Sequence, residues 1–344
     1  MKSRITLGRS FFVRSFQAAL PGMGCTLVMA MGMPSPAIAM QINGLESPHS
    51  VLADPANNSY YISNINGEPD ARDNNGFITK LNGQAEIVGI KFISGGEQGT
   101  TLHAPKGMAF IDQVLYVADV DTLRAFDKNS GKTMMTIAMT PSPLLPARPL
   151  SLIDIAANDQ GLLFVSDMPG NTIYKVDTKQ RHAVSVFIHD ERLAGPAGVA
   201  VHPKTGHIIV VSWEKGSILD ISQDGVLTEL VSNSFFTSRF QNLSGIDFDR
   251  WGNMYVSDLT KGKVWRMQPN NKFQVIAEFL PAPADVGIDR VNNLILVPYQ
   301  QANVAEVNGL ETPVGATGEN RKRTLADYGF VAPPKQDKSE RTNK

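Results

Sequence analysis

The chain has 344 residues, a formal net charge of −1 from 32 Lys and Arg against 33 Asp and Glu, and a composition that is 42% hydrophobic and 19% charged. This is the composition of an ordinary globular protein with a sizeable core. Residues 1–39 contain four basic and no acidic residues, so the remainder is mildly acidic, which argues against nucleic acid as a partner.

Residues 1–39 read as a secretory signal peptide. Basic residues precede the apolar run Ala18–Met33, and Ala37-Ile38-Ala39 has the small-x-small pattern of a cleavage site. The alternative is a membrane anchor, but this run of about 16 residues is short for a span that needs roughly 20. We therefore expect cleavage before Met40, no membrane span afterwards, and a periplasmic or secreted protein. Cys25, the sole cysteine, would leave with the signal, so the mature chain can form no disulfide.

A short pattern recurs along residues 40–310. It ends a predicted strand six times, at Ile62-Ser63-Asn64, Val117-Ala118-Asp119, Val165-Ser166-Asp167, Val211-Ser212-Trp213, Val256-Ser257-Asp258 and Val297-Pro298-Tyr299. The mean spacing over the five intervals is 47 residues. Another strand precedes each copy and begins near a Pro-x-Gly-type turn, as at Pro105-Lys106-Gly107. Six copies at this period predict a repeat architecture.

The predicted fold is an all-β, six-bladed β-propeller of four-stranded antiparallel blades over residues 40–310. A helical solenoid is the alternative for this period, but no repeat shows helical spacing of apolar residues. The last repeat lacks a good fourth strand, so we expect Gln41–Leu45 to supply it and close the ring. Residues 311–344 are charged and poor in aromatics and predict a disordered tail.

Two stretches carry a family resemblance. The stretch Asp249–Asp258 (DRWGNMYVSD) and the stretch Gly161–Asp167 (GLLFVSD) resemble the NHL repeat, and residues 40–310 as a whole are similar to the SMP-30/gluconolactonase-like propellers. This resemblance implies a six-bladed propeller. It specifies chemistry poorly, because the group contains lactonases, other hydrolases and binding proteins.

The resemblance also implies where a metal would lie. Lactonases of this group hold one divalent cation, calcium or zinc, in the central channel, and Glu46-Ser47-Pro48 matches their first ligand motif. The blade-three, blade-four and blade-five positions are instead Ile153, Ala197 and Ser244, which supply too few oxygen ligands. The lactonase site is therefore depleted, and its metal-dependent mechanism is in doubt with it.

Other residues at the starts of the innermost strands are predicted to face the channel. Asp154 and Asp285 stand where blades two, four and five have Gly, so with Glu46 they are the candidate ligands of a rearranged metal site. The alternative is that each Asp caps a turn through backbone N–H groups. The candidate ligand-binding residues are His49, Ser50, Lys106, Ser244, Trp213 and Tyr299.

The remaining expectations concern recurring side chains and function. The Asp that ends the pattern is predicted to fix turns at Asp119, Asp167 and Asp258. Trp213 and Tyr299 replace it in blades four and six and are expected either to stack on a ligand or to fill space between blades. The leading hypothesis is an exported, monomeric propeller that binds a small molecule or a protein partner on one face. The alternatives are a metal-dependent lactonase or hydrolase, and a protein-interaction scaffold that uses the long loops 64–77 and 139–150.

Overall fold

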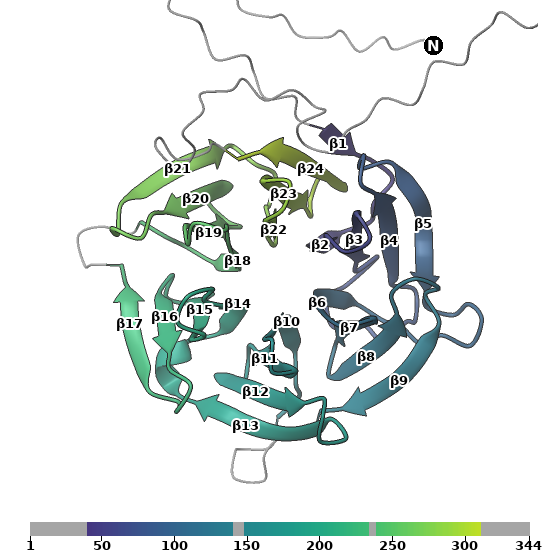
Figure 1. The fold of residues 1–344 in the computed structure, drawn as a ribbon, viewed down its shortest axis with the longest axis horizontal. Coiled ribbons are helices and arrows are strands. Elements are labelled where there is room, and N and C mark those ends of the chain that lie inside the picture. Colours follow the sequence, from purple (N-terminus) through teal and green to yellow (C-terminus); the bar gives the residue numbers. More distant parts are fainter. Residues whose placement is uncertain (1–39, 140–147, 234–238, 311–344) are drawn as a thin grey trace, which may run out of the picture. The chain divides into compact units, whose positions relative to one another are not determined.

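The computed structural model describes residues 40–139, 148–233 and 239–310. These residues form six four-stranded antiparallel sheets arranged as blades around a central channel, the predicted six-bladed β-propeller (Figure 1). The predicted signal peptide, the predicted tail and most of the loop 139–150 lie outside the described residues. The one helix described is the single 3-10 turn η1 (Glu191–Leu193), and no described helix is long and apolar enough to cross a membrane.

Within each blade the strands follow one another outwards from the channel (Figure 1). Blade 1 contains β2 (Pro48–Asp54), β3 (Ser59–Asn64), β4 (Phe77–Asn82) and β5 (Ile87–Ser94). Blade 2 contains β6 (Pro105–Ile111), β7 (Val114–Asp119), β8 (Thr122–Asp127) and β9 (Thr133–Ala138). Blade 3 contains β10 (Leu152–Ala157), β11 (Leu162–Asp167), β12 (Thr172–Asp177) and β13 (Ala183–His189).

The second half of the ring repeats this order. Blade 4 contains β14 (Pro196–Val201), β15 (Ile208–Ser212), β16 (Ile218–Ile221) and β17 (Leu227–Val231). Blade 5 contains β18 (Leu243–Phe248), β19 (Met254–Asp258), β20 (Lys263–Met267) and β21 (Phe273–Glu278). Blade 6 contains β22 (Gly287–Asp289), β23 (Leu294–Tyr299), β24 (Val304–Gly309) and, as its outermost strand, β1 (Met40–Ile42).

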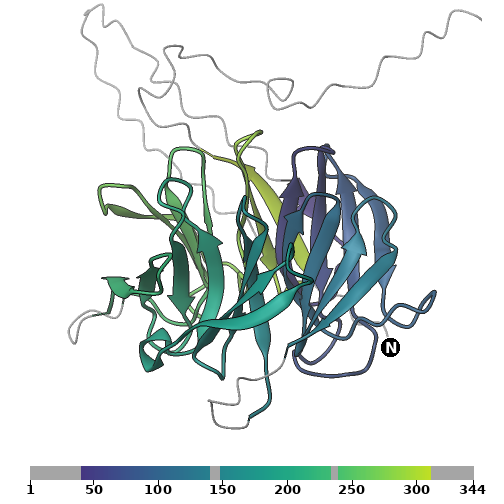
Figure 2. The ribbon, with the colours of Figure 1, turned by 60° about the horizontal axis from the view of Figure 1, so that its bottom comes forward.

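The ring is closed by the N-terminal strand, as predicted. Met40 pairs with Val307 and Ile42 with Ala305, so β1 covers the edge that β24 would otherwise leave open. The closing strand is shorter than the predicted stretch, because Leu45 lies beyond it and packs into the core between blades 1 and 6. The strands of all blades run between the two faces of the ring, and the turns gather on those faces (Figure 2).

The core lies between neighbouring blades. The second strand of each blade is largely apolar and almost entirely buried, whereas outermost strands such as β9 and β17 are mostly exposed. Buried clusters therefore join the inner parts of adjacent blades, as between blades 2 and 3. This packing holds the six innermost strands in a ring around the channel.

The recurring pattern at the end of the second strand has a structural reason. The carboxylate of Asp119 accepts the backbone N–H groups of His103 and Ala104 at 2.8 Å, which fixes the loop that leads into β6. Asp167 binds the N–H of Ser151 in the same way, and Asp258 binds that of Gln241. The prediction that these aspartates fix turns is confirmed.

Candidate functional site

Each innermost strand is irregular at the same point. In blades 1 to 5 the pairing of the inner strand with the second strand shifts register after its first residue, as between Pro48 and Val51. In blade 6 an isolated bridge between Pro283 and Tyr299 precedes β22. Two inner-strand residues thus lie opposite one residue of the second strand, which defines a β-bulge. The predicted Pro-x-Gly turns are these bulges, because the chain continues as a strand on both sides.

The two residues of each bulge, here called the bulge pair, contain most of the predicted site residues. The pairs are His49–Ser50, Lys106–Gly107, Ile153–Asp154, Ala197–Gly198, Ser244–Gly245 and Ala284–Asp285. Hydroxyls of the recurring pattern hold several of them: Ser166 Oγ accepts the N–H of Asp154 and Ser257 Oγ accepts that of Gly245. A bulge turns side chains away from the regular alternation of a strand, and here Ser50, Asp154 and Asp285 of the pairs face the channel.

Glycines of neighbouring blades make room for the two aspartates of the bulge pairs. A Cβ atom built on Gly107 would lie 2.3 Å from Oδ1 of Asp154, and one built on Gly245 would lie 2.3 Å from Oδ1 of Asp285. Real Cβ atoms do not approach so closely. The Gly that precedes each of these Asp residues around the channel is therefore a steric match between adjacent blades.

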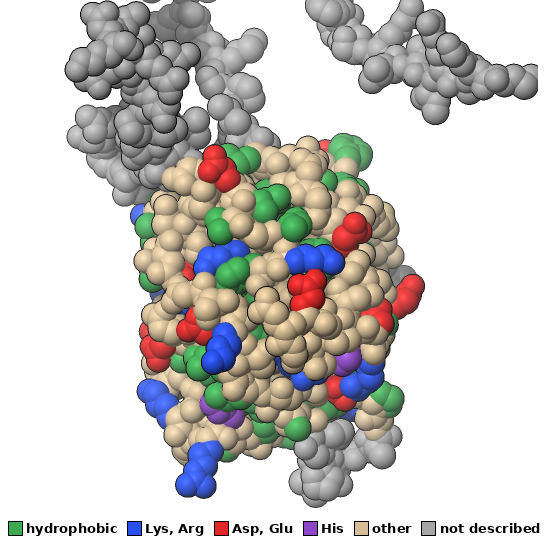
Figure 3. Space-filling view, turned by 90° about the vertical axis from the view of Figure 1, so that its right-hand side faces the viewer, with side chains coloured by type: hydrophobic (Ala, Val, Ile, Leu, Met, Phe, Trp, Pro, Cys, Tyr) green, Lys and Arg blue, Asp and Glu red, His purple; other side chains and the backbone are tan. Residues whose placement is uncertain are grey.

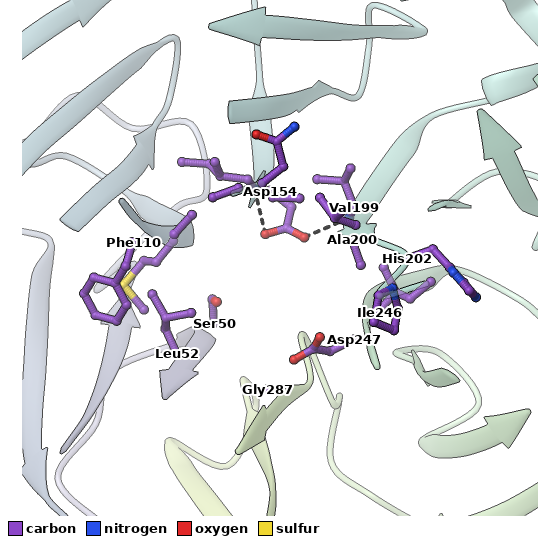
Figure 4. Close-up of a pocket in the computed structure, with 18 of the residues that line it drawn as sticks. Ser50, Leu52, Phe110, Asp154, Val199, Ala200, His202, Ile246, Asp247 and Gly287 are labelled. Atoms are coloured by element: carbon purple, nitrogen blue, oxygen red, sulfur yellow. Dashed lines mark hydrogen bonds between the residues drawn. The ribbon is translucent and has the colours of Figure 1, made fainter. Parts of the chain in front are cut away.

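A cavity of about 530 Å³ occupies the channel from these aspartates to the face where the inner strands end. Its inner end is formed by Ser50, Asp154 and Asp285, called here the acidic end. The apolar side chains of Leu52 and Phe110 form part of its wall, and Figure 4 shows the Asp154 carboxylate and the Ser50 hydroxyl directed towards the space between them. The other lining residues are both apolar and polar, and a cavity of this size is within the range of small-molecule sites.

The carboxylate of Asp154 is buried and held by backbone donors. Oδ1 accepts the N–H of Ile155 at 2.8 Å, and Oδ2 accepts the N–H of Val199 in the next blade at 2.8 Å (Figure 4). Burial, followed by the charge of Asp285, nevertheless raises the pKa of Asp154 well above its ordinary value. The turn-capping alternative is thus correct for its hydrogen bonds, although the same carboxylate also lines the cavity.

Asp285 lies in the opposite blade and behaves similarly. Its Oδ1 accepts the N–H of Val286 at 2.7 Å. Burial raises the pKa of Asp285 to about 7, and the charge of Asp247 acts in the same direction, while a hydrogen bond with Ser50 opposes the shift. The two carboxyl groups share one cavity, so they titrate as a coupled pair.

Asp247 is a third carboxylate of the cavity, and the sequence analysis did not identify it. It accepts the N–H of Ile288 at 2.9 Å and forms an ion pair with Arg290 at the mouth. Burial raises its pKa, and Arg290 opposes the shift. A signal was available: the equivalent residues of the other blades are Leu52, Ala109, Ala156, Ala200 and Gly287, all of them uncharged.

The first residues of the bulge pairs lie outside the cavity lining, and Lys106 and His49 among them mark the other end of the channel, called here the closed end. Lys106 is only 2% exposed, and its Nζ lies 3.4 Å from Oδ1 of Asp70, which belongs to the loop between β3 and β4. Asp70 also accepts the hydroxyl of Ser151 at 2.8 Å, so this loop reaches from blade 1 to blade 3. Burial lowers the pKa of Lys106, and Asp70 offsets part of the shift. Ser244 is also buried, and it lies outside the cavity lining.

His49 lies beside Lys106 at this closed end. Its Nδ1 is shielded from solvent and has no hydrogen-bond partner in the part of the chain that the structure describes. Burial, and then the charge of Lys106, lower the pKa of His49 to about 3. The imidazole is therefore neutral at physiological pH.

Neither predicted aromatic residue lines the cavity. Trp213 packs into the cluster between blades 4 and 5 beside Phe240. Tyr299 is buried between blades 5 and 6, and its hydroxyl donates to Glu306 at 2.8 Å. Burial and this hydrogen bond raise the pKa of Tyr299. Both residues fill space between blades, which was the alternative to ligand stacking.

The predicted metal ligands are not brought together. Glu46 is exposed on the loop before β2, where Oε2 lies 3.4 Å from the amide of Asn303, and it does not line the cavity that contains Asp154 and Asp285. Within residues 40–139, 148–233 and 239–310, no three His, Cys, Asp or Glu side chains are grouped so that they would hold a metal ion. The Glu-x-Pro match is a local likeness without the remaining ligands.

Comparison with solved structures defines the class of fold. Many solved chains match, and those named below cover about four fifths of this chain at 12–15% sequence identity. At such identities the likeness shows the fold alone, which is that of a six-bladed propeller related in architecture to lyases and gluconolactonase-like proteins. No protein-family model and no curated protein matches the sequence.

Three neighbours illustrate the likeness. Virginiamycin B lyase from Staphylococcus aureus is 12% identical, with a TM-score of 0.57 over 79% of this chain and 99% of that one. A streptogramin B lyase is 12% identical, with a TM-score of 0.53 over 78% and 97%. A provisionally named gluconolactonase is 15% identical, with a TM-score of 0.59 over 81% and 96%. The likeness to gluconolactonase-like propellers thus holds for the fold, and the NHL repeat stays a prediction.

Proposed function

We propose that the protein is an exported, monomeric propeller that binds a small organic molecule in its central cavity. The observation that carries the proposal is the cavity of about 530 Å³, whose wall contains apolar and polar side chains and leads to the buried carboxyls of Asp154 and Asp285. Buried groups with shifted pKa values in a cavity are uncommon outside functional sites. The signal-like residues 1–39 support export.

The outer rim gives less support to binding a protein partner. In the view over blades 1 and 2, basic, acidic and hydrophobic side chains are interspersed, and no single kind gathers into a large patch (Figure 3). The large exposed hydrophobic residues are spread over the ring, for example Val88 on β5, Met134 on β9 and Val186 on β13. Scattered residues of this kind are normal for a soluble surface. The central cavity is therefore the favoured site.

The metal-dependent hydrolase has weaker support from this geometry, because Glu46 lies away from Asp154 and Asp285. Two structural neighbours are lyases, and a further one is a catalytically inactive His-to-Ala variant of virginiamycin B lyase with quinupristin. The only histidine that lines the cavity among the residues described here is His202, at the mouth. These features do not assemble a catalytic set, so binding is the proposed activity.

Thermal unfolding with a library of small amines, organic acids, sugars and lactones tests the proposal. A compound that binds only the folded state raises the unfolding temperature. At a hundredfold excess over its dissociation constant, it adds about 2.7 kcal/mol to the free energy of unfolding. Leu52→Trp, which fills the cavity, should abolish the shift. The matched control Ile87→Trp, on the exposed outer strand of the same blade, should retain it.

The proposal fails if no compound shifts the unfolding temperature. It also fails if the shift persists unchanged in Leu52→Trp, because the compound would then bind elsewhere. Both variants must first show a cooperative transition without ligand, so that a lost shift reports a lost site.

A further inference from the structure

The acidic end of the cavity holds two carboxyl groups that have no cationic partner among the described residues. None of the ion pairs described involves Asp154 or Asp285. The cation that lines the cavity, Arg290, is at the mouth and is paired with Asp247. The other cation of the channel, Lys106, is beyond the cavity lining and contacts Asp70. Two buried carboxylates without an ion-pair partner are costly when both are ionised.

The protein nevertheless holds both carboxylates firmly in place. Asp154 is 6% exposed and Asp285 is 7% exposed, and each accepts at least one backbone N–H group. Gly107 and Gly245 leave the space that their Oδ1 atoms occupy. Each carboxylate oxygen has two lone pairs, so a backbone hydrogen bond to an oxygen leaves it able to accept another donor. The acidic end is thus a rigid set of acceptors that faces the cavity.

Apolar side chains line part of the remaining wall, beside polar ones such as Asn158 and Gln160. Leu52, Phe110 and Ile246 line the space between the acidic end and the mouth (Figure 4). A molecule that fits both parts has a positively charged, hydrogen-bond-donating head and an uncharged hydrocarbon body. Such a head would neutralise the pair and donate charge-assisted hydrogen bonds, while the body would be removed from water.

We propose that the cavity selects organic cations, with a primary ammonium or amidinium head between Asp154 and Asp285 and an apolar body along Leu52 and Phe110. This inference rests on the proposed small-molecule binding and assigns the chemical class of the ligand. A bare metal ion fits the acidic end less well, because the described residues do not gather a third acidic, His or Cys ligand there. An organic anion would meet like charges without a basic partner.

Three probes with one body and different charges test the inference: benzylamine, benzyl alcohol and benzoate, measured by calorimetric titration at pH 8 on residues 40–344. We expect binding of benzylamine, with the alcohol and the acid at least about tenfold weaker, as expected when a charge-assisted hydrogen bond is lost. Asp154→Asn and Asp285→Asn, which keep the shape of the side chain, should each weaken benzylamine by about tenfold or more.

Asp258→Asn is the matched control, because Asp258 is equally buried and also binds backbone N–H groups, but lies at the end of β19 outside the cavity lining. It should leave the affinity for benzylamine unchanged. Unfolding temperatures of all three variants establish that they are folded.

The inference is overturned if benzylamine does not bind, if benzyl alcohol binds as tightly, or if both cavity Asn variants keep the affinity. These outcomes are distinct from failure of the proposed function. A neutral or anionic library compound that is lost in Leu52→Trp but unaffected by the Asn variants would preserve the binding cavity and remove the preference for cations.

Discussion

The two ends of the central channel differ although adjacent residues of the same bulges build them. At the closed end, Lys106 is covered by the loop between β3 and β4 and contacts Asp70. At the acidic end, Asp154 and Asp285 border an open cavity and have no described ion-pair partner. One end is thus completed by the chain itself, whereas the carboxyl groups of the other have no cationic partner among the described residues. Under the proposed function, consecutive residues of a bulge would serve structure and binding.

The largest effect is expected at Gly107, because the absence of a side chain there leaves room for Asp154 at the acidic end. Gly107→Ala places a Cβ atom 2.3 Å from Oδ1 and 2.4 Å from Cα of Asp154, so the backbone of blade 2 or 3 must move. We expect a loss of about 3–4 kcal/mol in the free energy of unfolding. The control Gly89→Ala has its nearest contact at 3.5 Å and should be nearly neutral. Equal effects in urea denaturation would contradict the steric match.

The next effect concerns the charge of the acidic end. Folded Asp285 keeps its proton to about pH 7, whereas an ordinary Asp releases it near 3.8, so this carboxyl reduces stability as the pH rises through that window. The facing groups are Asp154, Asp247 and the Ser50 hydroxyl. Asp285→Asn should therefore stabilise the protein by roughly 2–3 kcal/mol more at pH 8 than at pH 4.5. Denaturation at the two pH values checks this, and a gain independent of pH would refute it.

The closed end should respond differently. Asp70→Asn removes the carboxylate that contacts buried Lys106, and we expect a loss of about 1 kcal/mol. Adding Lys106→Met, which replaces the cation by an apolar side chain of similar length, should restore most of this loss. Urea denaturation of the two single variants and the double variant forms the test cycle. Additive losses would show that the two charges are not coupled.

A comparably small effect tests whether the aromatic residue Tyr299 is structural. Tyr299→Phe keeps the ring between blades 5 and 6 and loses the hydrogen bond to Glu306. The free energy of unfolding should fall by about 1 kcal/mol, and benzylamine affinity should not change. A loss of benzylamine affinity without a loss of stability would show that Tyr299 belongs to the binding site.

Most of the fold could be predicted from sequence because its signals recur. Variants of one pattern end the second strands at a regular spacing, and in blades 3 and 5, where the pattern is Ser-Asp, both residues have the same structural role. The Ser binds the bulge, and the Asp fixes the preceding loop. The missing fourth strand of blade 6 pointed to β1 in the same way. Because the repeats are similar, an element that is clear in one blade predicts the corresponding element in the others.

The site was only partly predictable because it depends on contacts between blades. Asp154 and Asp285 stood out by replacing Gly, and the structure places both in the cavity. The Glu46 motif misled because Asn64 and Asn303 bind the N–H groups of Glu46 and Ser47 and anchor that loop near blade 6. Asp247 was missed because its partner Arg290 lies in another blade. No single repeat contains this information.

The closure of the ring has a consequence for the timing of folding. The three residues of β1 are among the first of the propeller to leave the ribosome, yet their partner β24 belongs to its last blade. Bringing such distant segments together carries a loop-closure cost that only the finished blades repay. The seam between β1 and β24 should therefore form last. Its amides should exchange with solvent more readily than those of β11, which lies deep within blade 3.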